Sequence, residues 1–161
     1  QRMAGDIHGL VIKPGNPATT YCTTPHGFSA STDDGASWDL QEFPQFNTPN
    51  WKPGDGSAYC RTIFVKPDDP EVMLVGTGDG IPGDTGAIRR TRDGGKTWDV
   101  PELPVKPNSV LYGFAAHVAM PDTIAAHSVN GYVYVSDDGG DSWRKLRKEF
   151  GQIRSLALSP N

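Results

Sequence analysis

The 161-residue chain has a formal net charge of −4, is 36% hydrophobic, and contains 19 glycines and 14 prolines. This charge balance excludes the broad basic surface of a nucleic-acid-binding protein, and no apolar run approaches the roughly 18 residues that would indicate a membrane-spanning helix. The density of glycine and proline is typical instead of many short strands joined by turns.

Three consecutive units of the chain each predict four β-strands, because apolar residues recur at every second position between proline- and glycine-rich turns. In chain order, the expected strands are 8–14, 19–24, 28–31 and 37–43 in the first unit, 61–67, 72–77, 87–91 and 97–103 in the second, and 112–118, 123–128, 132–136 and 142–150 in the third. Helical periodicity does not occur at a useful length.

The pattern Ser/Thr-x-Asp-x-Gly-x-Ser/Thr-Trp lies between the third and fourth expected strands of every unit. Its defining residues are Ser31, Asp33, Gly35, Ser37 and Trp38, then Thr91, Asp93, Gly95, Thr97 and Trp98, then Ser136, Asp138, Gly140, Ser142 and Trp143. The aspartates are 60 and then 45 residues apart, which is close to the roughly 40–50 residues of one propeller blade. The repeat therefore predicts an all-β propeller of four-stranded antiparallel blades at about 6–45, 59–104 and 110–150.

A fourth unit begins at the end of the sequence. Residues 152–160 match the first-strand register of the other units, so 151–161 is interpreted as the start of a further blade. Because propellers close with about 4–8 blades, we expect the chain to be part of a larger propeller, of about 6–8 blades, completed in cis or by oligomerisation.

The repeated octapeptide resembles the Asp-box, or bacterial neuraminidase repeat, of sialidases, sortilin-type receptors and photosystem II assembly factors. The resemblance implies a propeller fold and places these turns on the face away from the usual ligand site. Asp33, Asp93 and Asp138 are accordingly expected to be structural: each accepts backbone N–H groups, the glycine supplies a positive φ, and the tryptophan anchors the turn in the blade core.

The opposite face is expected to carry the ligand site, since the long loops at 44–59, 76–86 and 104–111 belong to it and long loops on a rigid scaffold commonly bind ligands. Alignment of the first strands brings four polar residues to equivalent positions at the mouth of the central channel: His8, Arg61, Tyr112 and Arg154. Arginine forks with further donors suit an anionic ligand. The alternative is that these side chains merely fill or hydrate the end of the channel.

Four further residues are candidates for the same face. His26, His127 and Asp79 lie near the loops between second and third strands, and Trp51 lies in the longest loop. A histidine and carboxylate group could ligate a metal, but no His-x-His or His-x-x-x-His spacing supports a metal site, so no cofactor is predicted. Trp51 could stack on a sugar ring or simply cap its blade.

Two functions are consistent with these residues. The first is a scaffold that binds a glycan, a small anion or a protein on the loop face. The second is a glycosidase-type hydrolase with its active site at the channel mouth, supplied in part by blades absent from this sequence. A standard sialidase is not expected, because Arg61 is followed by Thr-Ile-Phe and no Arg-Ile-Pro motif occurs. Cys22 and Cys60 are interpreted as buried thiols, which leaves the cellular compartment open.

Overall fold

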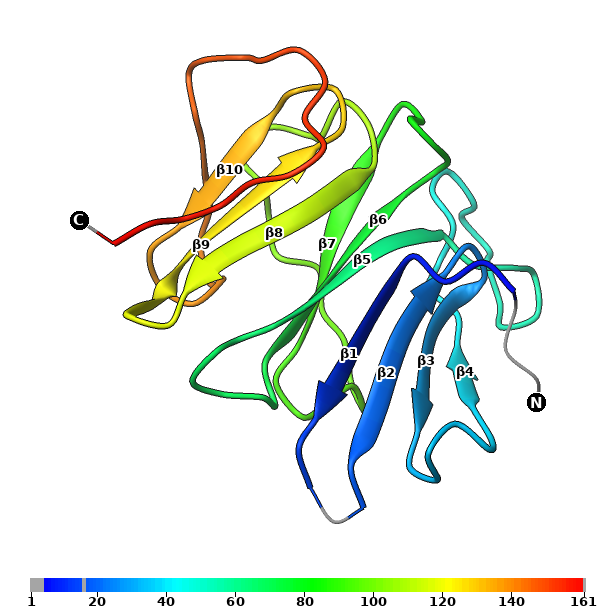
Figure 1. Cartoon of the computed structure of the whole chain (residues 1–161). Helices are drawn as coiled ribbons and strands as arrows, with labels where there is room; N and C mark the ends of the chain where they lie inside the picture. Colours follow the sequence, from blue (N-terminus) through cyan, green and yellow to red (C-terminus); the bar gives the residue numbers. More distant parts are fainter. Residues whose placement is uncertain (1–4, 16, 161) are drawn as a thin grey trace.

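The computed structural model describes residues 5–15 and 17–160, and these form three antiparallel β-sheets without a helix (Figure 1). The sheets follow one another along the chain, as the blade prediction requires. The first consists of β1 (Gly9–Lys13), β2 (Thr19–Thr24), β3 (Gly27–Ser31) and β4 (Asp39–Gln41), and the third of β8 (Leu111–His117), β9 (Met120–Ser128), β10 (Val133–Ser136) and β11 (Arg144–Lys145). Both are four-stranded meanders, which confirms the predicted blade architecture.

The middle sheet contains β5 (Tyr59–Val65), β6 (Met73–Gly78) and β7 (Gly86–Thr91). Its fourth strand is reduced to one bridge, in which Arg90 N donates to Asp99 O at 2.9 Å and Asp99 N donates to Arg90 O at 2.8 Å. Pro101 follows two residues later and has no N–H to extend the ladder. The outer strands expected at 37–43, 97–103 and 142–150 are thus all shorter than predicted.

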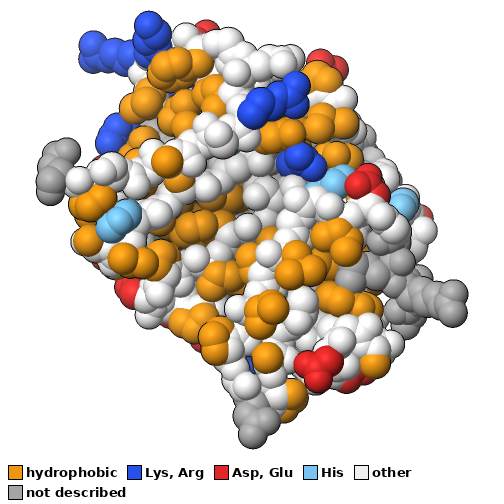
Figure 2. All heavy atoms as spheres, viewed as in Figure 1, with side chains coloured by type: hydrophobic (Ala, Val, Ile, Leu, Met, Phe, Trp, Pro, Cys, Tyr) orange, Lys and Arg blue, Asp and Glu red, His pale blue; other side chains and the backbone are white. Residues whose placement is uncertain are grey.

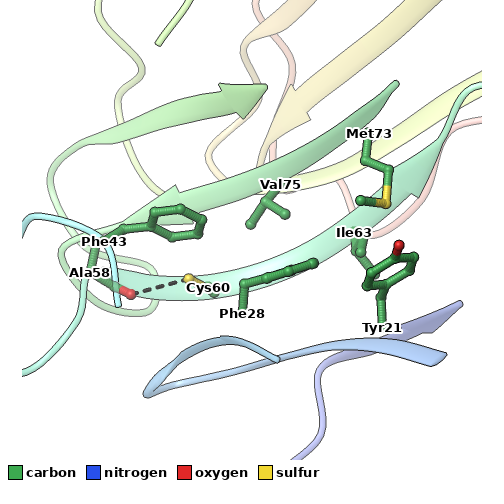
Figure 3. Close-up of a cluster of buried hydrophobic side chains, with 8 residues drawn as sticks. All are labelled: Tyr21, Phe28, Phe43, Ala58, Cys60, Ile63, Met73 and Val75. Atoms are coloured by element: carbon green, nitrogen blue, oxygen red, sulfur yellow. Dashed lines mark hydrogen bonds between the residues drawn. The ribbon is translucent and has the colours of Figure 1, made fainter. Parts of the chain in front are cut away.

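The hydrophobic cores lie between neighbouring blades. Figure 3 shows Tyr21 and Phe28 of the first blade pointing toward Ile63, Met73 and Val75 of the second. A second cluster joins the middle and third blades through Leu74, Ile88, Leu111, Ile124, Ala126, Tyr134 and Trp143. The inner strands β1, β5 and β8 therefore lie next to one another (Figure 1), and their starting residues are held on one face of the molecule.

The outward face of the first blade carries apolar side chains that no other blade covers. Leu10 and Ile12 are 51% and 62% exposed, and Figure 2 shows hydrophobic side chains gathered over this part of the molecule. By strand register these residues are the counterparts of Ile63 and Val65, which pack into the first core cluster. The same position of the repeat is therefore packed against a core where a preceding blade is present and exposed where none is.

Residues 152–160 form no strand in the structure, although the sequence predicted the first strand of a further blade there. The segment runs alongside the third blade (Figure 1), where Ile153 N donates to Val129 O at 3.0 Å. A β-strand requires a partner strand, and the second strand that would follow it in a blade is not among these 161 residues.

Both cysteines are buried thiols outside any disulfide, as predicted. Cys60 Sγ donates to Ala58 O at 3.3 Å (Figure 3), and burial raises the pKa of this thiol to about 12. Over the described part of the chain, no helix is long and apolar enough to cross a membrane.

Candidate functional site

The three Asp-box turns have the same hydrogen-bond geometry. In the first turn, Ser31 Oγ donates to Asp33 Oδ1 at 2.8 Å and accepts from Gly35 N at 2.9 Å, while Ser37 Oγ donates to Asp33 Oδ2 at 2.6 Å. The corresponding carboxylate contacts are 2.8 and 2.6 Å in the second turn and 2.8 and 2.5 Å in the third. Both oxygens of each carboxylate are therefore engaged in holding the turn.

These hydrogen bonds stabilise the ionised aspartates. The contacts from Ser37 and Ser31 lower the pKa of Asp33 to about 2, and those from Ser142 and Ser136 lower the pKa of Asp138 to about 2. The pKa of Asp93 is lowered in the same way, chiefly by Thr97. A carboxylate that accepts several hydrogen bonds has a low pKa because those bonds stabilise its ionised form. All of these hydrogen bonds come from residues of the same turn, so they agree with a structural role for the three aspartates.

Trp98 and Trp143 pack between blades, which corrects the expectation that the motif tryptophan lies in the core of its own blade. Trp98 meets Phe28 and Phe43 of the preceding blade edge-on, with ring centres 5.0 and 5.2 Å apart, and its Nε1 donates to Gln41 Oε1 at 2.9 Å. Each indole also donates to the glycine carbonyl of its own turn, as Trp98 does to Gly95 O at 3.1 Å. The tryptophan thus couples the turn to a neighbouring sheet.

On the opposite face, the structure brings three of the four aligned residues together. Arg61 Nη2 donates to Tyr112 Oη at 2.7 Å, and Arg154 Nη1 donates to the same oxygen at 3.5 Å. The guanidinium carbons of Arg61 and Arg154 lie 4.3 and 5.7 Å from the centre of the Tyr112 ring. The two guanidinium groups, that of Arg154 foremost, lower the pKa of Tyr112. We call Arg61, Tyr112 and Arg154 the arginine–tyrosine cluster.

His8, the fourth aligned residue, lies beside Tyr59 at the edge of this cluster. Its ring stands 4.8 Å from that of Tyr59, and His8 Nδ1 lies 2.7 Å from Cys60 O. Because a carbonyl only accepts, Nδ1 carries a proton, and Nε2 faces Tyr59 Oη and Asp6 Oδ2, each at 3.2 Å. The pKa of Tyr59 is raised, chiefly by burial, although the positive charge of Arg61 acts in the opposite direction.

Tyr59 is a member of this face that the sequence analysis missed. It precedes Arg61 by two residues on β5, and side chains two apart on a strand point to the same side. The alternation was therefore a signal that could have identified it. A bulge between Cys60 and Thr62 changes the local register, and only the structure shows that Tyr59 still contacts His8.

The other candidates occupy different surroundings. His127 is 1% exposed, and burial lowers its pKa. Its ring centre lies 6.0 Å from that of Tyr112, so it packs beneath the cluster as a buried side chain. His26 is exposed at the turn between β2 and β3, where its backbone N donates to Thr24 Oγ1 at 3.1 Å. His26 makes no described contact with the arginine–tyrosine cluster, and His127 contacts it through the ring of Tyr112.

Trp51 and Asp79 are both engaged in shaping loops. Trp51 Nε1 donates to Gly56 O at 2.6 Å, and its side chain lines an open groove along β4 together with Trp38, away from the inner strands. Asp79 Oδ1 accepts from Asp84 N at 2.9 Å and from Thr85 N at 3.2 Å. Asp79 also lines a cavity that contains Tyr59, which places it near the cluster.

Charges of both signs lie on this face, and they differ in whether they are paired: Asp6 lies 3.2 Å from His8. Within the described ranges, Arg61 and Arg154 form no ion pair with a carboxylate, whereas Arg90, Arg92 and Arg144 all do. Figure 2 shows basic side chains and histidine near the start of β8. No group of three His, Cys, Asp or Glu side chains in the described chain is placed to hold a metal ion. The chemistry that this arrangement favours is the binding of an anion.

Comparison with known proteins agrees with the fold. The model of the BNR/Asp-box repeat matches residues 134–145, which contain the third octapeptide. No curated protein sequence matches the chain.

Among solved structures, an ancestral GH74 enzyme has a TM-score of 0.66 and 20% identity, over 85% of this chain and 18% of the enzyme. The GH74 xyloglucanase from Xanthomonas campestris has a TM-score of 0.63 and 19% identity, over 88% of this chain and 20% of the enzyme. A structure of YCF48 bound to D1 peptide has a TM-score of 0.65 and 18% identity, over 96% of this chain and 45% of that protein. The chain thus spans less than half of each neighbour, and the likeness shows the propeller fold.

Proposed function

As the chain is a β-propeller built from Asp-box repeats, we propose that it binds an anionic ligand on the face opposite the Asp-box turns. The single observation that carries this proposal is the convergence of Arg61 and Arg154 on the hydroxyl of Tyr112. Two cations this close repel each other, and in the described residues no carboxylate pairs with either one. An anion bound between them would relieve that repulsion.

The hydrogen-bond inventory of the cluster also favours an acceptor ligand. Tyr112 Oη accepts from both guanidinium groups, so its own proton is available to donate outward. Each guanidinium has five N–H donors, and Arg154 uses another of them on Gln152 Oε1 at 3.1 Å. A carboxylate, phosphate or sulfate group is the acceptor that such forks match, whether a small ion, a glycan or a protein carries it.

The hydrolase alternative requires two carboxylates flanking the scissile bond, about 5–10 Å apart. Among the residues that the structure describes, no carboxylate contacts the cluster, and Asp79 Oδ1 is occupied by two backbone N–H groups of its loop. Binding without chemistry is therefore the function that these residues support best.

The proposal is tested by titrating the chain with inorganic phosphate and with acetate, monitored by NMR. We expect saturable binding that Arg61→Ala weakens about tenfold or more, because a hydrogen bond to a charged group contributes about 1.5–3 kcal/mol. Arg147→Ala is the matched control, since Arg147 is exposed beyond β11 on the outer side of the third blade. Equal affinities for wild type, Arg61→Ala and Arg147→Ala would overturn the proposal.

A further inference from the structure

An open groove of about 730 Å³ follows the outer strand of the first blade. One wall consists of β4 and its flanking residues, 38–42, and the other of Trp51 and Pro53 from the long loop before β5. Because β4 is the last strand of its sheet (Figure 1), its outer edge pairs with no strand of the described chain. No residue of this groove belongs to the arginine–tyrosine cluster.

The carboxylate of Asp39 in this groove lacks the internal cation that its counterpart in the second blade has. Asp39 and Asp99 both directly follow the tryptophan of their motif. Arg90, opposite Asp99 on the neighbouring strand, donates from Nε to Oδ1 at 3.0 Å and from Nη2 to Oδ2 at 2.7 Å. The residue opposite Asp39 is Ala30, so within the described ranges no cation of the chain pairs with Asp39.

Glu42 adds a second carboxylate at the other end of β4. Its Oε2 accepts from Gly54 N at 2.5 Å, whereas its Oε1 takes part in no hydrogen bond with the described residues. The wall of the groove contains no lysine or arginine. Residues three apart on an extended chain are about 10 Å apart, so the groove presents two negative charges at about this separation.

The two tryptophans of the groove present apolar faces, because their polar edges are already used. Trp51 Nε1 donates to Gly56 O at 2.6 Å and Trp38 Nε1 donates to Gly35 O at 3.1 Å. Leu40, between the two carboxylates, is 41% exposed. Indole faces attract cations, and the alkyl stems of lysine and arginine cover apolar surface while their charged ends stay in water.

We propose that this groove binds a basic peptide segment in an extended conformation, which adds a strand to the free edge of β4. An exposed sheet edge pairs with such a segment through backbone hydrogen bonds. One lysine or arginine of the peptide gives Asp39 the cation that Arg90 gives Asp99, and a second, three residues away, reaches Glu42. Their alkyl stems lie on the tryptophans. A neutral glycan would contact the indole faces but leave both carboxylates without a cation.

The test titrates the full chain with the peptide acetyl-Thr-Lys-Val-Thr-Lys-Val-amide, followed by calorimetry. We expect saturable binding, and none for the analogue with glutamate in place of both lysines. Asp39→Asn is expected to weaken binding about two- to fivefold, the range for one exposed ion pair. Asp34→Asn is the matched control, since Asp34 is exposed in the adjacent turn and does not line the groove, and it should leave the affinity unchanged.

Two further analogues test the added strand, each with one N-methyl group, at the third or the fourth residue. Alternate N–H groups of a strand point to opposite sides, so one analogue should bind about threefold or more weakly, the loss of one backbone hydrogen bond, and the other as well as the parent peptide. Parent affinity in both analogues would rule out strand addition. Equal effects of Asp39→Asn and Asp34→Asn would reduce the binding to net charge and contradict the site. Binding of cellotetraose without binding of the lysine peptide would show that the groove takes a glycan instead.

Discussion

Arg61 and Tyr112 connect the second and third blades. The guanidinium of Arg61 on β5 donates to the Tyr112 hydroxyl on β8 at 2.7 Å, and its carbon lies 4.3 Å from the centre of the same ring. One arginine therefore makes both a hydrogen bond and a cation–π contact with one tyrosine. The pair joins the inner strands of neighbouring sheets, and in the proposed function it also positions a charge for the ligand.

Tyr112→Phe separates these two roles, because it keeps the ring and removes the hydroxyl. We expect a loss of about 0.5–1.5 kcal/mol in the free energy of unfolding, the usual contribution of one hydrogen bond, together with weaker binding of phosphate and acetate. Urea denaturation and NMR titration measure the two effects. Tyr132→Phe is the control, since Lys145 lies 4.1 Å from the centre of its ring on the outer side of the blade. If both variants bind the anions equally well, the Tyr112 hydroxyl is not part of the site.

The Asp-box carboxylates predict an acid-dependent stability. The pKa values of Asp33 and Asp138 are about 2 in the folded chain, below the usual value of about 3.9 for an unfolded aspartate. A depressed pKa contributes stability above the unfolded value, and this contribution is lost as the pH falls toward the folded value. We expect a melting temperature that changes little between pH 7 and 5 and falls between about pH 4 and 2.

Asp138→Asn tests the assignment of that acid transition. The amide cannot ionise, so the variant is expected to be less stable at neutral pH and to show a smaller decrease between pH 4 and 2. Thermal melts followed by circular dichroism measure both quantities. A decrease as large as that of the wild type would show that other groups cause the acid dependence.

Position 95 requires glycine for two reasons, the backbone conformation and the close approach of a neighbouring side chain. Its φ is +92°, and a Cβ at this position would lie 3.0 Å from Phe28 Cζ. Gly54 also has a positive φ, +98°, but a Cβ there would meet nothing within 4 Å. We expect Gly54→Ala to cost about 1–2 kcal/mol of stability and Gly95→Ala clearly more, as measured by urea denaturation. Equal losses of stability in the two variants would show that the contact with Phe28 adds nothing to the cost of a side chain at position 95.

The exposed face of the first blade predicts self-association. Leu10 and Ile12 are the register counterparts of Ile63 and Val65 in β5, which pack into the first core cluster, and a contiguous apolar surface favours contact with another molecule. Sedimentation velocity of the wild type should show concentration-dependent association, which Leu10→Lys with Ile12→Lys abolishes. Val105→Lys with Val118→Lys changes two other exposed residues, 44% and 75% exposed, and should leave association unchanged. A monomeric wild type at all concentrations would contradict this expectation.

The repeat pattern in the sequence predicted more of this structure than composition did. Because the octapeptide fixes the register of each unit, the alignment of first strands correctly brought Arg61, Tyr112 and Arg154 into one cluster. Loop residues have no such register. The position of Trp51 could therefore not be predicted by alignment. The sequence placed it in a loop of the candidate face, whereas in the structure it lies along β4, in the groove with Trp38.

Features that depend on contacts between blades also escaped prediction. The burial of a motif tryptophan is decided by the preceding blade, as Trp98 shows against Phe28 and Phe43. The contact between Tyr59 and His8 joins two sheets in the same way. Sequence periodicity describes one strand at a time, and such contacts become visible only once the sheets are placed.

The most direct test of anion binding at the arginine–tyrosine cluster is an acetate titration of the chain with ¹⁵N-labelled arginine side chains. The Nε–H signals of Arg61 and Arg154 are predicted to shift together and to saturate with one shared affinity, while the signal of Arg147 stays in place. Shifts of Arg61 and Arg154 that are absent, or that match Arg147 in size and never saturate, would contradict the proposed site.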